Sequence, residues 1–368
     1  MNQTIMAVSP PSSLNSLLTP IQTQYNLPAL AGCIVTSKGL IAVGAVGMRK
    51  FGSDVPVTLN DPFHLGSDTK AMTAFLVALL VEQGKLQWDT PLSKALPQLA
   101  AQMQPDYRRV TIRMLLEHRS GFSAESWPPG QTFQSLHHLP GTPMKQRLAY
   151  ARMILADPPV NPPDTTFLYS NRNYALLGVI LEQLTHTPWE KLITDKLFHP
   201  LHMTTAGFGA MGTVGKIDAP WQHVFGPDGK PDPIPPGPLS DNPDVIAPAG
   251  KVHCSVEDWA KFIQCVLRGM EGRNGLLQAT TLQRLLAPSP GSNYAGGWLI
   301  TDRPWGGGRV YTHAGSNTMN FCVAWVAPKR DFAVLIATNI GGDRAAEACD
   351  AAASTLIRFY LGSPTAPK

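Results

Sequence analysis

Two side chains able to perform chemistry stand three residues apart, Ser67 and Lys70, just before a nearly apolar run from Ala71 to Val81. Residues three apart on a helix share one face, and Gly84 follows the run, so we expect a buried helix over 67–83. A lysine is poorly placed there, because a helix N-terminus is partly positive and burial penalises an ammonium. Burial would lower the pKa of Lys70, which could then take the proton of a nucleophilic Ser67. The structural alternative is a serine cap with a lysine that reaches the surface.

A second polar group opens another apolar helix. Tyr169 and Asn171 directly precede a run that is expected to be helical over 173–184. A tyrosine beside a lysine can titrate below its usual pKa of about 10 and act as a general base. Asn171 is suited to orient a substrate amide or to hold Lys70. The alternative is a buried tyrosine with a satisfied hydroxyl and an asparagine that caps the helix.

The third group runs from His313 to Ser316, at the expected end of a strand. Small residues such as Ala314 and Gly315 at a strand edge let a substrate backbone lie close, and they expose a backbone N–H as an oxyanion donor. The second donor would be the N–H of Ser67, which is free at a helix start. A structural histidine is the alternative for His313.

The elements that must position these groups change in type along the chain. The expected strands cover 29–37, 40–48, 297–301, 308–313, 320–327 and 333–339, and the expected helices cover 67–83, 111–118, 173–184, 189–197, 255–267 and 344–360. Proline-rich stretches at 158–163 and 227–248 are expected to be long loops. We therefore predict an α+β fold in which residues 1–66 and 250–368 build one antiparallel sheet flanked by helices. Residues 67–249 would form a mostly helical inserted lobe, with the active site at the interface.

Five segments, in this order, resemble the penicillin-recognising serine hydrolases: class C β-lactamases, serine DD-peptidases and β-lactamase-like esterases. The segments are FHLGSDTKAMTA, LLEHRSGF, YSNRNYALLGVILEQLT, PAGKVHCSVEDWAKF and HAG. The patterns S-x-x-K and Y-x-N each occur once in the chain. The resemblance spans nearly the whole chain, and it implies the β-lactamase/DD-peptidase-like fold and an acyl-enzyme mechanism without a cofactor.

Carried over residue by residue, the resemblance implies that Ser67 is acylated and that Lys70 and Tyr169 share the proton transfers. The N–H groups of Ser67 and Ser316 would form the oxyanion hole. The residues implied to bind substrate are Asn171, His313, Gly315 and Ser316. His313 departs from class C β-lactamases, which have a lysine at this place. A histidine is mostly neutral at pH 7 and suits a substrate carboxylate less well, so efficient β-lactam turnover is in doubt.

Composition excludes several classes of function. Of the 368 residues, 43% are hydrophobic and 15% charged, which allows a sizeable core, and a net charge of +4 without basic runs argues against a nucleic-acid partner. The longest apolar run is too short to cross a bilayer, and MNQTIMAVSPPSSLNSLL lacks the pattern of a secretory signal. We therefore expect a cytoplasmic protein with no membrane contact, or a periplasmic or secreted one if the start has been trimmed. The five cysteines show no C-x-x-C and are expected to be buried thiols.

Other motifs are set aside. Residues 207–212 match G-x-G-x-x-G, yet no apolar strand precedes them and no helical pattern follows, so dinucleotide binding is not expected. The histidine pairs 137/138 and 199/202 lack further ligands at metal spacing, so no metal is expected, and no G-x-S-x-G elbow occurs. The expected function is a serine hydrolase of a small-molecule acyl substrate, foremost a carboxylesterase. A β-lactamase, a D-alanyl-D-alanine carboxypeptidase, an acyl transferase and an inactive binding protein are the alternatives, and the oligomeric state is open.

Overall fold

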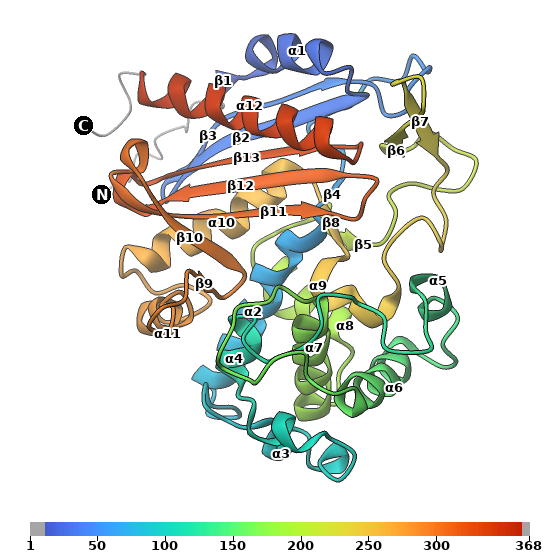
Figure 1. The fold of residues 1–368 in the computed structure, drawn as a ribbon. Helices are drawn as coiled ribbons and strands as arrows, with labels where there is room; N and C mark the ends of the chain where they lie inside the picture. The colour runs from blue at the N-terminus through green and yellow to red at the C-terminus, as the bar shows by residue number, and fades with distance from the viewer. Residues whose placement is uncertain (1–11, 363–368) are drawn as a thin grey trace.

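An eight-stranded sheet forms one half of the molecule (Figure 1), as the computed structural model of residues 12–362 shows. The strand order is β1-β3-β2-β13-β12-β11-β10-β9, and all neighbours are antiparallel except β1 and β3. The sheet is assembled from the two ends of the chain, which confirms the predicted α+β architecture. Its strands are β1 (Ser12–Ser13), β2 (Ala29–Thr36), β3 (Gly39–Gly47), β9 (Tyr294–Ala295), β10 (Trp298–Arg303), β11 (Gly308–Ser316), β12 (Phe321–Ala327) and β13 (Phe332–Thr338).

Helices cover both faces of this sheet. α1 (Asn15–Gln24) and α12 (Asp343–Leu361) pack on one face, and α10 (Val256–Met270), next to α11 (Ala279–Leu285), packs on the other (Figure 1). Side chains alternate between the faces along each strand, so Val310 joins the core under α12 while its neighbour Tyr311 joins the larger core on the other side.

The other half of the molecule is mostly helical and is centred on α2 (Thr69–Glu82). Nearly every residue of α2 from Thr69 to Leu80 is buried, which a helix that is apolar all round requires. The helices around it are α3 (Leu92–Ala95), α4 (Ile112–Leu116), α5 (Phe133–Leu136), α6 (Pro143–Ala156), α7 (Asn171–Thr185), α8 (Trp189–Ile193) and α9 (Ala247–Gly250). The end of α2 that carries Lys70 therefore lies where the two halves meet.

Two small sheets lie beside this junction. One consists of β4 (Phe63–His64), β8 (Val252–Cys254) and β5 (Gly207–Phe208), and it places the segment before Ser67 against the segment before α10. The other is the hairpin of β6 (Gln222–Phe225) and β7 (Pro231–Ile234). The stretch 227–248, expected to be a long loop, thus contains strand β7 and the beginning of α9.

The expected elements near the site recur with shifted ends. Ser67 lies on a 3-10 turn, Gly66–Asp68, that precedes α2, and α7 begins at Asn171, where the side chain of Ser170 accepts from the N–H of Arg172. Ser255 caps α10 by accepting from the N–H of Asp258. α1, which contains a proline, and α6, whose apolar residues are interrupted by charged ones, were not predicted.

Other expectations concern burial and location. All five cysteines are free thiols, and four are buried as expected, whereas Cys265 is only partly buried. Residues 1–11, part of the segment considered for an export signal, lie outside the described range. No helix within residues 12–362 combines the length and apolar composition needed to span a bilayer.

Two glycines let the sheet edge meet the segment before α2. Gly66 has a φ of +46°, and a Cβ atom on it would lie 2.3 Å from the backbone nitrogen of Ser316. A Cβ atom on Gly315 would lie 2.0 Å from the carbonyl oxygen of Leu65. Because no larger residue fits either position, these glycines bring the backbones that flank Ser67 and Ser316 into contact.

Arg147 on α6 connects this helix to other segments of the helical half through hydrogen bonds. Its guanidinium is fully buried and donates to Glu182 Oε1 at 2.6 and 3.0 Å, to both carboxylate oxygens of Glu190 at 2.8 and 2.9 Å, and to the carbonyl of Asp244 at 2.9 Å. Glu182 is also buried, so removal of the arginine would leave a carboxylate without a counter-ion in the interior.

We predict that Arg147→Ala lowers the free energy of unfolding by about 3 to 5 kcal/mol, measured by urea denaturation. Lys191→Ala is the matched control, because it breaks an exposed ion pair with Asp195 and should cause no measurable loss. A loss at Arg147 as small as at Lys191 would show that the buried cluster contributes nothing to stability.

Candidate active site

The amine of Lys70 is fully buried at the start of α2 and has three polar neighbours. Its Nζ atom lies 2.9 Å from Ser67 Oγ, 2.8 Å from Asn171 Oδ1 and 2.8 Å from the carbonyl oxygen of Ala249. Two of these atoms can only accept hydrogen bonds, whereas the serine hydroxyl can also donate. A neutral amine has two hydrogens and one lone pair, so it can donate to the two carbonyl oxygens and accept from Ser67.

The electrostatics of the site favour this neutral form. Burial lowers the pKa of Lys70 well below its ordinary value, and the nearby carboxyl of Asp68 only partly opposes the shift. Burial also raises the pKa of Asp68 well above its ordinary value, against the opposing effects of the Cys322 thiol, 3.1 Å away, and of Lys70. Both groups are pushed toward neutrality, which is the state in which Lys70 can accept a proton.

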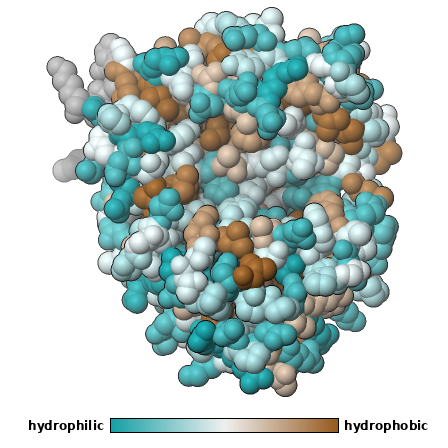
Figure 2. All heavy atoms as spheres, viewed as in Figure 1, coloured by the Kyte–Doolittle hydropathy of each residue, from teal (hydrophilic) through white to brown (hydrophobic). Residues whose placement is uncertain are grey.

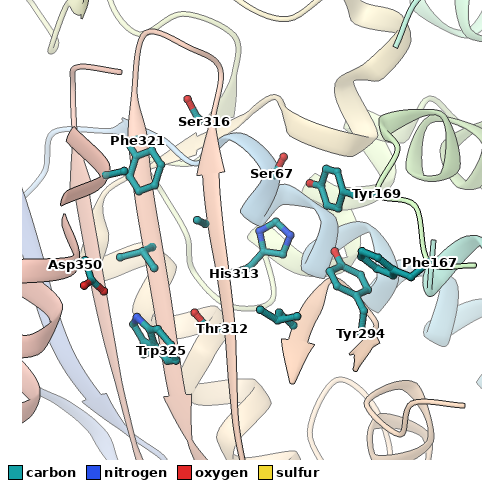
Figure 3. A pocket seen from close by; sticks show the side chains of 14 residues that line it. Ser67, Phe167, Tyr169, Tyr294, Thr312, His313, Ser316, Phe321, Trp325 and Asp350 are labelled. Atoms are coloured by element: carbon teal, nitrogen blue, oxygen red, sulfur yellow. The ribbon is translucent and has the colours of Figure 1, made fainter. Parts of the chain in front are cut away.

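Tyr169 lies on the other side of Ser67. Its hydroxyl points toward Ser67 (Figure 3), and it has no hydrogen-bond partner among the described residues. The Lys70 Nζ atom is 4.7 Å from the centre of its ring. Burial raises the pKa of Tyr169, although the Ser67 hydroxyl opposes the rise. The expectation that the lysine lowers this pKa is wrong for the free protein, because burial dominates and also disfavours the charged form of the amine beside it. Tyr169 is therefore a phenol with a proton to donate.

Asn171 fills the role of holding Lys70. Its side-chain oxygen accepts from Lys70 Nζ, and its Nδ2 atom donates to Ser126 Oγ at 3.0 Å. Both ends of the amide are thus engaged, and Asn171 does not line the cavity described below. Its contact with substrate stays a prediction, whereas the hydrogen bond to Lys70, the other expected role, is present in the structure.

The third motif forms the edge of the sheet at the end of β11. His313 is buried, with its ring centre 6.0 Å from that of Tyr169 and 5.9 Å from that of Tyr294. Burial, followed by the effect of Lys70, lowers the pKa of His313 to about 3, so the ring is neutral at pH 7. Ser316 borders the cavity, and Gly315 packs behind it against Leu65.

Sequence analysis missed two aromatic residues of the site, His118 and Tyr294. The His118 ring stacks on Tyr169 at 4.4 Å, and its Nδ1 atom accepts from the N–H of Ser170 at 3.2 Å, which fixes the segment that carries Tyr169. Burial, and to a lesser extent Lys70, keeps the pKa of His118 well below its ordinary value. The segment LLEHRSGF was the available signal for His118, whereas Tyr294 belongs to none of the recognised motifs.

A cavity of about 590 Å³ lies in front of Ser67 and continues across β11 and β12 to α12 (Figure 3). Figure 2 shows this face of the molecule hollowed between the two halves. Apolar side chains line much of the cavity, among them Leu299, Val323 and Trp325. Of the lining residues, all within the described part of the chain, only Asp350 on α12 is acidic, and none is a lysine or arginine.

Comparison with known proteins agrees with this geometry. A family model described as Beta-lactamase matches residues 14–356. The chain belongs to the beta-lactamase family. It is a serine hydrolase of that family, which confirms the resemblance of the five sequence segments.

Two curated relatives illustrate how far this beta-lactamase-family chain has diverged. Penicillin-binding protein 4 from Amycolatopsis lactamdurans is 27% identical over 338 residues, which cover 87% of this chain and 83% of the relative. Protein flp from Staphylococcus aureus (strain N315) is 23% identical over 325 residues, which cover 86% of this chain and 61% of the relative. The chain therefore spans about three fifths of the length of that second protein.

Solved structures share the fold at low identity. The octameric penicillin-binding protein homologue from Pyrococcus abyssi has a TM-score of 0.75 and 22% identity, with 94% of this chain and 77% of that chain covered. The D-amino acid amidase from Ochrobactrum anthropi SV3, complexed with L-phenylalanine amide, has a TM-score of 0.70 and 20% identity, with 94% and 96% covered. At such identities the likeness shows the fold alone.

The lowered pKa of Lys70 predicts a specific effect of pH on stability. Its folded pKa lies below its unfolded value of about 10.4, so between the two the unfolded state binds more protons and stability rises with pH. We predict that Lys70→Met removes this slope, which reaches about 1.4 kcal/mol per pH unit for one group, and that it stabilises the protein most at the acidic end of the window. Urea denaturation of both proteins from pH 6 to 9 measures this difference, and parallel pH profiles would show that Lys70 is charged in the folded protein.

Proposed function

We propose that this protein is a carboxylesterase that cleaves small esters of apolar, uncharged acyl groups through an acyl-enzyme on Ser67. The observation that carries the proposal is the charge of the cavity: its lining holds no cation, and His313 at the sheet edge is neutral. β-Lactams and peptide C-termini carry a carboxylate, which has no counter-ion here. A neutral ester needs none, so it suits this cavity better.

The first step follows from the contacts of Lys70. As Ser67 Oγ attacks the ester carbonyl, its proton passes to the Lys70 lone pair, 2.9 Å away. The N–H groups of Ser67 and Ser316, brought together by Gly66, would stabilise the negative oxygen that develops. When the C–O bond to the leaving group breaks, the protonated phenol of Tyr169 is placed to supply the proton that the alcohol needs.

The second step reverses these transfers. Water replaces the alcohol and attacks the acyl carbonyl, giving its proton to the Tyr169 phenolate, and the Ser67 oxygen recovers its proton from Lys70 as the acid leaves. An acceptor alcohol in place of water would turn the same steps into acyl transfer. Leu299, Val323 and Trp325 offer the acyl chain an apolar surface beyond β11.

Hydrolysis of amino-acid amides is a second candidate, and one observation favours it. The single charged group in the cavity lining is the carboxylate of Asp350, which would attract the ammonium group of such a substrate. The D-amino acid amidase named above shares the fold, which is compatible with this candidate.

We predict that Ser67→Ala lowers the turnover of p-nitrophenyl butyrate by at least about a thousandfold, because it removes the nucleophile. The matched control is Ser255→Ala, which removes the cap of α10 far from the site and costs about 1 kcal/mol of stability without loss of activity. If Ser67→Ala turned over the ester at the wild-type rate, Ser67 would not be the nucleophile.

The charge of the cavity predicts a substrate preference. For p-nitrophenyl esters of butyric, glutaric and 4-aminobutyric acid, kcat/KM should be lowest for the anionic glutarate. Asp350→Lys should raise kcat/KM for the glutarate about threefold to tenfold and lower it for the aminobutyrate, because the charge facing the acyl end is reversed. Glu347→Lys, also exposed on α12 but outside the lining, makes the same change in net charge and should shift neither ratio. A wild-type preference for the glutarate would contradict the proposed selectivity.

A further inference from the structure

A buried histidine holds the backbone just before the nucleophile. His64, the last residue of β4, is completely buried, and its Nδ1 atom accepts from the N–H of Gly66 at 3.0 Å. A ring nitrogen that accepts carries no hydrogen, so the imidazole hydrogen is on Nε2. Nε2 lies 2.8 Å from Asp241 Oδ1, within ion-pair distance, so the ring contacts the carboxylate through this nitrogen.

The same carboxylate oxygen reaches the other side of the site. Asn317, the residue after Ser316, donates from Nδ2 to Asp241 Oδ1 at 3.0 Å and to Gln222 Oε1 at 2.7 Å. Asp241 and Asn317 are both buried. Burial by itself would raise the pKa of Asp241, but His64 and Asn317 outweigh it and hold this pKa below its ordinary value. Asp241 is thus a buried carboxylate whose contacts with His64, at 2.8 Å, and with Asn317, at 3.0 Å, come from the two halves of the active site.

We propose that Asp241 is a positioning residue that sets the distance between the two backbone donors of the oxyanion hole. On one side, Asp241 contacts His64, which accepts from the N–H of Gly66 next to Ser67. On the other side, Asp241 accepts from Asn317, the residue after Ser316. This inference rests on the function proposed for Ser67.

This positioning by Asp241 matters because the two backbone donors lie on different elements. The backbones of Gly66 and Ser316 are in direct contact, yet they belong to different elements, the turn before α2 and the end of strand β11. Donors stabilise an oxyanion only near 2.7–3.1 Å, and loss of one donor costs about a hundredfold to a thousandfold in kcat. A shared carboxylate oxygen keeps both elements in register, and it does so from the stretch 227–248, outside every recognised motif.

The test compares Asp241→Ala with Asp241→Asn, which keeps an oxygen able to accept from both donors. Three quantities are measured: kcat and KM for p-nitrophenyl butyrate, the Kd of phenylboronic acid, which forms a tetrahedral adduct on a nucleophilic serine, and the melting temperature. Asp241→Ala should lower kcat about tenfold to a hundredfold, raise the boronate Kd by a similar factor and leave KM within about twofold. Asp241→Asn should recover kcat to within about threefold of wild type.

Two further variants keep the result decisive. Asn317→Ala removes the contact between Asp241 and the segment after Ser316, together with the hydrogen bonds of Asn317 to Gln222, Met319 and Asn320. It should show the same loss of kcat and of boronate affinity even if Asp241→Ala fails to fold. Asp244→Asn is the matched control, because it removes a carboxylate three residues away that pairs with Lys251, and it should leave kcat unchanged.

The outcomes separate the inference from the proposed function. If folded Asp241→Ala or Asn317→Ala keeps the wild-type kcat and boronate Kd, the inference is wrong and the proposed function stands. The same holds if KM rises by the same factor as kcat falls and both changes parallel a fall in melting temperature. A fluorophosphonate probe that labels Ser67 in wild type establishes the nucleophile independently of the ester. Absence of that labelling would overturn both the proposed function and the inference.

Discussion

The burial of the Lys70 amine is the constraint on which the site depends. An ammonium deprived of water is costly, and the surroundings of Lys70 supply two carbonyl oxygens and one hydroxyl, which suit the neutral amine. That choice of neighbours defines the chemistry, since an uncharged lysine is a base and its lone pair is directed at Ser67. The same burial keeps the groups nearby neutral, because it favours protonated Asp68 and Tyr169 and uncharged His313.

The rest of the fold brings this base to a substrate. α2 carries Lys70 into the interior, and the two glycines 66 and 315 let the sheet edge approach until Ser67 and Ser316 lie side by side. The cavity then extends from the polar group at Ser67 over an apolar surface toward α12. In the proposed function, reactivity is set at the junction of the two halves, while selectivity would be set on the sheet and on α12. This division lets one catalytic group serve substrates of different charge when a residue such as Asp350 changes.

The sequence was informative where neighbouring residues alone reveal an energetic cost, such as the burial of a charged group. Ser67 and Lys70 were found because a lysine at the start of an apolar helix is unfavourable unless it has a function. The strands of the sheet were found because apolar runs alternate with turns. The pKa of Tyr169 could not be predicted, because its direction depends on whether the neighbouring lysine is charged in the folded protein. His64, Asp241 and Asn317 are far apart in the chain and form no motif, so only the fold reveals that they share one contact. α6 was missed because Lys145, Arg147 and Arg152 interrupt its apolar residues, and only the fold shows that Arg147 is buried against two carboxylates.

The most direct test of the account is the protonation state of Lys70 in the folded protein. Lysine labelled with carbon-13 at Cε reports it by NMR, and the signal that is absent from Lys70→Met belongs to Lys70. The account predicts that this signal has the chemical shift of a neutral amine at pH 7 and titrates far below the ordinary value of about 10.4. If the Lys70 signal keeps the chemical shift of an ammonium group up to about pH 10, the central claim is wrong, because Ser67 would then have no base beside it.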